Sequence, residues 1–202
     1  MSGYIVYDCE TQLKSDQVEG GWNNVYGMGM SSCVTYDSEH DIYLMWPHDS
    51  RDKLCEYLNN RLVVTFNGIM FDSQLLLGND RVLEDNGVTA NGQYSWQNAD
   101  IYVEMWRRIL KMDKSDYPEI VKKIREQRFP RGIFNLDSVA SATLQTKKLG
   151  DGADAPGLYQ SNRIVELFQY NLQDTRVTTK LYDFIKEFKY IVTGGFDIVS
   201  FK

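Results

Sequence analysis

Short apolar runs separated by polar turns fill the first third of the chain, and this pattern predicts strands. Residues 4–7 (Tyr-Ile-Val-Tyr) are continuously apolar, which is typical of a buried central strand, and we expect that strand to end at Asp8. Residues 25–36 and 42–46 predict two further strands, joined by a polar hairpin loop. Residues 62–66 predict a fourth strand, which Asn67-Gly68 ends.

Apolar residues at helical spacing predict helices between and after these strands. One helix should follow Asp49 or Ser50, and a second should carry Phe71, Leu75 and Leu76. Later starts are indicated by capping or first-turn residues, at Asp100, at Pro118, at Asn135 or Asp137, and at Ser161, whose helix should run to about residue 188. Residues 78–98 and 150–157 are rich in Asn, Asp and Gly, and we expect irregular structure there.

The order of these elements predicts the fold class. Strands come first, strands then alternate with helices, and helices dominate the second half, so we expect an α/β layered domain with a mixed sheet. The tail at 190–200 predicts a β-hairpin that turns at Gly194-Gly195.

Composition agrees with one folded domain. The chain has 202 residues, of which 43% are hydrophobic, enough for a core without metal or disulfide staples. No apolar stretch approaches the roughly 20 residues of a membrane helix, and the first ten residues do not resemble a secretory signal. Cys9, Cys33 and Cys55 fit neither a disulfide framework nor zinc-site spacing, so we expect a reducing compartment. We expect a cytoplasmic protein of bacterial, archaeal or viral origin.

Charge is distributed unevenly along the chain. The formal net charge is −6, but residues 101–148 hold eleven basic and six acidic side chains, which gives this stretch +5 and leaves −11 for the rest. Such asymmetry is expected when acids gather metal ions while a separate face meets phosphate. The alternative is a solvated pair of charged helices.

Two carboxylates stand at the end of the first predicted strand. Asp8 and Glu10 are two residues apart, so in an extended chain they project from the same face. Two anions that close repel each other, and a divalent metal ion would remove the conflict. The alternative is a pair of surface acids at a strand exit.

Two further polar groups lie on predicted helices. Asp72 falls in the first turn or two of the helix after Asn67-Gly68, where an acid also suits the helix dipole. Tyr170 and Asp174 are four residues apart in the long helix and therefore share a face. Ordinary helix packing is the alternative explanation for both.

Taken together, these pieces resemble a known family. Asp8-x-Glu10, Asn67-x-x-x-Phe71-Asp72 and Tyr170-x-x-x-Asp174 are similar, in order and context, to the three exonuclease motifs of the DEDD superfamily. The likeness is strongest to the 3′–5′ exonuclease domain of family B DNA polymerases, extends to the segment Phe134–Ala140, and covers about residues 4–188. Gln169 stands where the histidine variant carries its histidine, so Tyr170 makes the chain resemble the tyrosine (DEDDy, DnaQ-like) type.

The resemblance implies a ribonuclease H-like fold over residues 1–188, with a mixed five-stranded sheet, and places the hairpin at 189–202 outside it. It also implies two bound divalent ions, and an all-oxygen ligand set suits Mg²⁺ or Mn²⁺. Asp8 would bridge both ions, Glu10 and Asp174 would complete the ion that activates water, Asp72 would serve the second ion, and Tyr170 would orient the attacking water.

The implied activity is two-metal-ion hydrolysis of phosphodiester bonds from the 3′ end of single-stranded or frayed nucleic acid, with DNA favoured over RNA and nucleoside monophosphates released. A polymerase, replication or repair protein acting in trans is the implied partner. Candidate substrate contacts combine the second motif with the basic stretch: Asn67, Phe71, Arg107, Arg108, Lys122, Lys123, Arg128 and Arg131. Lys147 and Lys148 are further basic candidates, and Tyr94, Trp96, Phe129 and Phe134 are aromatic side chains that could stack on bases. A catalytically inactive binding module and a structure-specific endonuclease remain alternatives.

Overall fold

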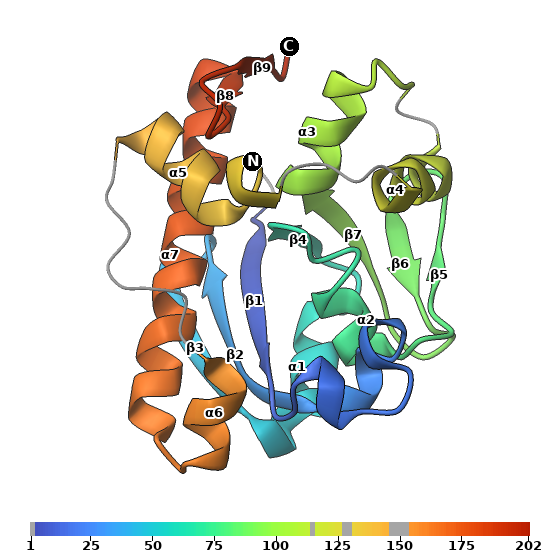
Figure 1. Cartoon of the computed structure of the whole chain (residues 1–202), viewed down its shortest axis with the longest axis vertical. Helices are drawn as coiled ribbons and strands as arrows, with labels where there is room; N and C mark the ends of the chain where they lie inside the picture. The colour runs from blue at the N-terminus through green and yellow to red at the C-terminus, as the bar shows by residue number, and fades with distance from the viewer. Residues whose placement is uncertain (1–2, 114–115, 127–130, 146–153) are drawn as a thin grey trace.

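A computed structural model describes residues 3–113, 116–126, 131–145 and 154–202. Seven strands form one mixed sheet in the order β3-β2-β1-β4-β7-β6-β5, with helices on both faces (Figure 1). The strands of this sheet are β1 (Ile5–Thr11), β2 (Met30–Asp37), β3 (Ile42–Pro47), β4 (Leu62–Thr65), β5 (Val82–Leu83), β6 (Val88–Ala90) and β7 (Ser95–Asp100). The predicted α/β class, with a mixed sheet flanked by helices, is confirmed.

The helices occupy the spaces between strands and most of the second half of the chain. They are α1 (Arg51–Leu58), α2 (Asp72–Leu77), α3 (Ile101–Ile109), α4 (Tyr117–Glu126), α5 (Leu136–Leu144), α6 (Ala155–Gln160) and α7 (Ile164–Phe188). A separate antiparallel hairpin, β8 (Tyr190–Val192) and β9 (Ile198–Ser200), follows α7. Within the described ranges, no helix is long and apolar enough to cross a membrane.

The expected count of five strands is wrong, because residues 82–100 form β5, β6 and β7 instead of irregular structure. The polar sequence of β7 hid this strand. Its inward positions include Trp96 and Asn98, and the Asn98 side chain donates to Gly87 O (2.9 Å) and Thr89 Oγ1 (2.6 Å). A buried amide that finds partners on the neighbouring strand is tolerated in a sheet interior.

Three element boundaries also differ from expectation. Strand β1 continues past Asp8 to Thr11, because β2 pairs with it along that whole length. Residues 26–28 form a 3₁₀ turn instead of the start of β2, since glycines interrupt the β-forming residues there. Helix α6 begins inside the expected loop at 150–157, capped by Asp154, and Ser161 ends α6 while α7 begins at Ile164.

Several predicted starts and turns are confirmed. The Asp100 side chain accepts hydrogen bonds from the Tyr102 and Val103 backbone and so caps α3. Asn135 caps α5 in the same way. The C-terminal tail forms the expected hairpin, whose turn encloses Gly194-Gly195.

The central strand β1 separates two hydrophobic layers. Val6 and Val64 pack into one cluster with α3, α4, α5, α7 and the hairpin, to which the hairpin adds Ile191 and Val199. Ile5 and Tyr7 pack into the other cluster, with α1 and α2. Because side chains alternate along a strand, Asp8 and Glu10 face the same layer as Val6. That layer contains α7, which lies lengthwise beside β1 and β2, with α6 near one end and the hairpin near the other (Figure 1).

The Trp106 side chain anchors the larger cluster, and its removal gives a test of this core. Trp106 is fully buried and its ring centroid lies 4.5 Å from that of Phe134. We expect Trp106→Ala to lower the free energy of unfolding by about 3–5 kcal/mol, measured by urea denaturation. Trp22, which is 65% exposed, is the matched control, and Trp22→Ala should cost less than about 1 kcal/mol. Equal losses in the two variants would contradict this assignment of the core.

Candidate metal centre

Strand β1 presents two half-buried carboxylates to the layer that contains α7. Asp8 and Glu10 lie on one face of the strand, and Cys9 between them is buried on the other. The pairing of β1 with β2 continues through Asp8, Cys9 and Glu10, so the backbone that carries both acids is fixed on that side. The carboxylates therefore project from within β1, and the expectation that they stand at the end of the strand is wrong.

Helix α7 brings a third carboxylate to this pair. One oxygen each from Asp8, Glu10 and Asp174 lie within 4.8 Å of one another. Asp174 and Tyr170 share a face of α7, and the Asp174 carboxylate contributes to the raised pKa of Tyr170. Residues distant in sequence thus form one group of oxygen ligands.

The Asn171 side chain joins α7 to the central strand, and the sequence did not single it out. Its Nδ2 donates to Asp8 Oδ2 (2.6 Å) and to Asp8 O (3.0 Å), and Asn171 is fully buried. Ser32 on β2 donates to Asn171 Oδ1 (3.3 Å). The signal that could have found Asn171 is its position three residues before Asp174, which places it on nearly the same side of the helix.

Asp72 reaches the same strand from α2. It is the first residue of α2, it is buried, and its Oδ1 accepts a hydrogen bond from the Cys9 backbone N–H (2.7 Å). Asp72 is not one of the three carboxylates that converge within 4.8 Å. The negative charge of Asp72 nevertheless adds to the effect of burial in raising the pKa of the Asp8 carboxyl.

The loop before Asp72 is shaped by a second buried acid, Asp100. Asp100 accepts hydrogen bonds from the backbone N–H groups of Asn67 (2.9 Å) and Ile69 (2.8 Å), in addition to capping α3. Asn67 adopts a left-handed φ of 71°, which asparagine tolerates, and a Cβ at Gly68 would come within 2.5 Å of the Thr65 side chain. The sequence predicted Asp100 only as a helix start, whereas it also fixes the loop that carries Asn67, Phe71 and Asp72.

The centre concentrates negative charge in a partly dry environment. Burial raises the pKa of Asp8 well above its ordinary value, and the nearby carboxylates of Asp72, Glu10 and Asp174 raise it further. Burial also raises the pKa of Asp72 to about 7. In the described ranges, neither Asp8 nor Asp72 forms an ion pair with a basic side chain. Hard divalent cations bind oxygen ligands of this kind, so the donor set fits Mg²⁺ or Mn²⁺.

Tyr170 is kept in its neutral form. Burial raises its pKa above the ordinary value for tyrosine, and the charges of Glu10, Asp174 and Asp8 and the hydrogen bond with Asp174 act in the same direction. Its hydroxyl therefore retains its proton at neutral pH and serves as a hydrogen-bonding group at the edge of the carboxylate cluster.

Two of the expected substrate contacts have structural partners instead. Arg107 pairs with Glu104 (3.0 Å), and Arg108 donates to the backbone oxygens of Ser200 (2.7 Å) and Lys202 (2.8 Å). The Arg107 pair lies within α3, whereas the Arg108 bonds fasten α3 to β9 and to the C-terminal residue. The C-terminal end of α7, after which the hairpin begins, lies about 20 Å from Asp174 along the helix, at 1.5 Å per residue.

The other expected contacts have varied positions. Lys122 and Lys123 lie on α4, where Lys122 pairs with Glu119 (3.6 Å). Trp96 is 1% exposed, so the expectation that it could stack on a base is wrong, and Phe134 packs against Trp106. Several candidates lie outside the described residues or have undescribed side chains, namely Arg128, Phe129, Arg131, Lys147 and Lys148.

Arg81 is a basic side chain beside the Asp72 loop that the sequence did not indicate. Its Nη2 donates to Ile69 O, and its Nε is buried without a hydrogen-bond partner. Burial lowers its pKa to about 10, and the charge of Arg125 on α4 contributes. No ion pair offsets this guanidinium in the part of the chain that the structure describes.

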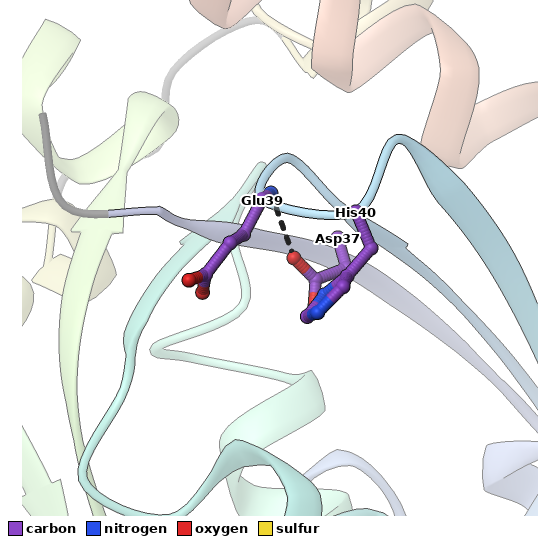
Figure 2. A group of neighbouring side chains, drawn as sticks. All are labelled: Asp37, Glu39 and His40. Carbon is purple, nitrogen blue, oxygen red and sulfur yellow. Dashed lines mark hydrogen bonds and ion pairs between the residues drawn. The ribbon is translucent and has the colours of Figure 1, made fainter.

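A second acidic group lies at the turn between β2 and β3. Ligand atoms of Asp37, Glu39 and His40 lie within 4.8 Å of one another, and Figure 2 shows the Glu39 backbone N–H directed at the Asp37 carboxylate. This group already has a cation, because Arg61 lies 3.5 Å from Asp37 and 3.7 Å from Glu39. Tyr57 also donates to Asp37 (2.6 Å), so the group stabilises the turn.

Metal binding at the Asp8 centre should stabilise the fold. Above pH 7 we expect Mn²⁺ to add about 2.7 kcal/mol to the free energy of unfolding when free metal is about 100-fold above its Kd, measured by thermal denaturation. Asp8→Asn should abolish most of this gain. Asp85→Asn, at an exposed acid in the β5–β6 turn, should retain it. A full gain in the Asp8 variant would contradict the assignment of the ligands.

The Asp37 turn should contribute stability that depends on pH. Although burial raises its pKa, hydrogen bonds from Tyr57, the Glu39 backbone and His40, with the charge of Arg61, lower the pKa of Asp37 to about 2. An acid whose folded pKa is depressed stabilises the protein above its unfolded pKa, about 3.9, and loses that contribution as pH falls through the folded value. Urea denaturation should therefore show Asp37→Asn less stable than wild type at pH 6, with the gap closing as the pH falls from about 4 towards 2. A gap that does not change with pH would contradict this, and Asp41→Asn, at an exposed neighbour, is the control.

Comparison of the sequence with known protein families and with curated proteins finds no match. The chemistry assigned to the chain therefore depends on the positions of its own side chains.

Proposed function

We propose that the chain is a metal-dependent 3′–5′ exonuclease of the tyrosine (DEDDy) type. The observation that carries the proposal is the convergence of Asp8, Glu10 and Asp174 within 4.8 Å, from a strand and a helix far apart in sequence. Asp72, bound to the strand at Cys9, and Tyr170, which shares a helix face with Asp174, complete the five side chains that the motif resemblance implies.

The strand order supports a ribonuclease H-like fold for the chain. In the part of the sheet running β3-β2-β1-β4-β7, a central strand is antiparallel to one neighbour and parallel to the other. Strands β6 and β5 extend this five-stranded core at the β7 edge. The carboxylates stand on the central strand and on the long helix packed against it, where two chain segments can hold one cluster rigidly.

The residues of the centre divide into ligands and positioning groups. Asp8, Glu10 and Asp174 would hold one divalent cation, and Asp8 with Asp72 would hold a second. When bound, two such ions supply an activated water molecule and stabilisation of the leaving oxygen. The Asn171 side chain donates to Asp8 Oδ2, so the orientation of the Asp8 carboxylate does not depend on the substrate.

Tyr170 positions the attacking water by hydrogen bonding and does not act as a base. Its raised pKa keeps the phenol protonated near neutral pH, so it cannot accept the proton of that water molecule. Its hydroxyl shares a helix face with Asp174, and from there it would hydrogen-bond a water molecule at the scissile phosphate.

The charge around the centre supports a nucleic-acid substrate. Arg81, beside the Asp72 loop, and Arg125 on α4 provide positive charge that no carboxylate in the described ranges pairs with. Phosphate groups of a single strand are the anions that such guanidinium groups bind. DNA is the favoured substrate, RNA is the second, and a replication or repair protein acting in trans is the proposed partner.

The activity can be tested with end-labelled single-stranded and duplex oligonucleotides. We expect Mg²⁺ or Mn²⁺ to support release of nucleoside monophosphates from the 3′ end, and a chelator to stop it. Asp8→Asn and Asp174→Asn should abolish digestion, whereas Tyr170→Phe should lower kcat by up to about 10²-fold, since only water placement is lost.

Two controls separate the proposal from its alternatives. Asp85→Asn should digest at the wild-type rate. A circular single strand should resist digestion, because an exonuclease needs an end, so its cleavage would indicate an endonuclease. Binding without any metal-dependent digestion would indicate an inactive binding module.

A further inference from the structure

A pocket lies between the end of α3 and strand β9, two elements that contact each other (Figure 1). Its volume is about 480 Å³, a size typical of ligand-binding pockets. The described residues that line it are 107–109, 111, 112, 198–200 and 202, and together they are called the α3–β9 surface below. None of them belongs to the candidate metal centre, so a ligand bound here would occupy a separate site.

The α3–β9 surface carries an excess of positive charge. Its described lining contains Arg107, Arg108, Lys111 and Lys202 and no acidic residue. Glu104 offsets part of this charge, because it lies 3.0 Å from Arg107 and 3.9 Å from Arg108. In the described ranges, Lys111 and Lys202 form no ion pair, and both are exposed. The chain as a whole has a net charge of −6, so this surface is a local exception that attracts anions.

Aliphatic side chains lie among these cations. Ile198 is 72% exposed and Ile109 is 37% exposed, whereas Val199 is buried in the main core and Met112 packs against it. Cationic groups attract an acid, and aliphatic surface that is open to water favours contact with another aliphatic side chain. The α3–β9 surface therefore fits a ligand that carries acidic and aliphatic groups together.

The outer edge of β9 adds backbone groups to this surface. The Phe201 backbone N–H donates to Lys189 O (2.7 Å), so the odd-numbered residues of this strand face β8. Ile198 and Ser200 therefore direct their backbone groups away from β8, and the Arg108 bond to Ser200 O shows that this edge faces α3. An extended peptide could pair with the backbone of Ile198 at this edge.

A nucleic-acid strand matches the α3–β9 surface less well than a peptide does. Binding of single strands without sequence preference combines cations with aromatic side chains on which the bases stack. The described lining contains no aromatic residue, and the nearby Phe201 ring is covered by the Arg108 guanidinium, 4.9 Å from the ring centroid. A phosphate backbone would also leave Ile109 and Ile198 without an apolar partner.

We propose that the α3–β9 surface is a docking site for an acidic, extended segment of a partner protein. The segment places an aliphatic side chain against Ile109 and Ile198, and its carboxylates approach Arg108 and Lys111. This inference goes beyond the proposed exonuclease function, because it concerns how the chain is attached to a partner and does not involve the metal centre.

The test measures the binding of a fluorescein-labelled peptide with two leucines among four acids (GEDLELDG) to the whole chain by anisotropy. We expect Lys111→Glu to weaken binding by about tenfold, because attraction becomes repulsion. Ile198→Ser should weaken it by a similar factor, about tenfold, because the aliphatic contact is lost. Two matched controls should bind like wild type: Lys53→Glu, at an exposed lysine of α1, and Val165→Ser, at a side chain that is also 72% exposed. Equal effects in the variants and their controls would overturn the docking site.

Altered probes identify the class of ligand. Replacing both leucines of the peptide by serine should weaken its binding to wild type by about tenfold, and replacing its four acids by amides should abolish binding. Equal binding of the serine peptide, or displacement of the original peptide by inorganic phosphate, would indicate a simple anion site and overturn the proposal. Displacement by excess oligothymidylate would assign the surface to nucleic acid, with the same consequence.

A second copy of the chain is the remaining occupant that the test can detect. Sedimentation of wild type and of Lys111→Glu should show the same oligomeric state. Self-association of wild type that this substitution abolishes would assign the surface to a second copy and overturn the docking site. A Kd above about 1 mM for the original peptide would overturn it as well.

The docking site and the exonuclease can fail separately. Asp8→Asn should bind the peptide as wild type does, because the α3–β9 surface shares no described residue with the metal centre. Peptide binding without any metal-dependent digestion would support the docking site and overturn the exonuclease. Digestion without peptide binding would do the reverse.

Discussion

The hydrogen bonds from the Asn171 side chain to Asp8 are the interaction on which the candidate site depends. They tie the longest helix to the central strand, and they do so at the residue whose carboxylate is shared by every proposed ligand set. Thr175, one turn later, also donates to Val34 O on β2 (3.3 Å), so the helix is fixed to two neighbouring strands. These hydrogen bonds fix Asp174 and Tyr170 relative to Asp8 and Glu10, on a helix that also packs into the main core through Leu181 and Ile185.

Hydrogen bonds from uncharged groups also allow the fold to keep several carboxylates close together. Burial and, after it, repulsion from the neighbouring carboxylates raise the pKa of Asp8. The neighbouring backbone offsets part of the cost, since Asp72 accepts the Cys9 N–H and Asp100 accepts two N–H groups of the preceding loop. Asp8 and Asp72 accept hydrogen bonds from uncharged donors, the Asn171 side chain and the Cys9 backbone, so a cation can still approach these two carboxylates. A cluster held by lysine or arginine, like the Asp37 turn with Arg61, lacks that capacity.

Some of this could be predicted from the sequence because local rules decide it. A continuous apolar run marks β1, a polar cap marks α3 and α5, and the spacing of Tyr170 and Asp174 fixes them to one helix face. Strand β7 was missed because Asn98 obtains its hydrogen-bond partners from β6, which no local pattern reveals. Arg107 and Arg108 were expected at the substrate because charge in a sequence does not show its partner, and theirs are Glu104 and the backbone of β9. The α3–β9 surface was missed for a related reason, since segments far apart in the sequence form it.

The terminal hairpin has a consequence for the chain as a cooperative unit. Ile191 and Val199 are buried in the same cluster as Trp106 and Leu181, and Arg108 grips the last strand through its backbone oxygens. Shortening the chain at residue 188 would therefore open a hole in the main core and remove the backbone acceptors of the two Arg108 hydrogen bonds. The terminal hairpin is therefore part of the main core. Its proteolytic removal would destabilise the layer that contains α7.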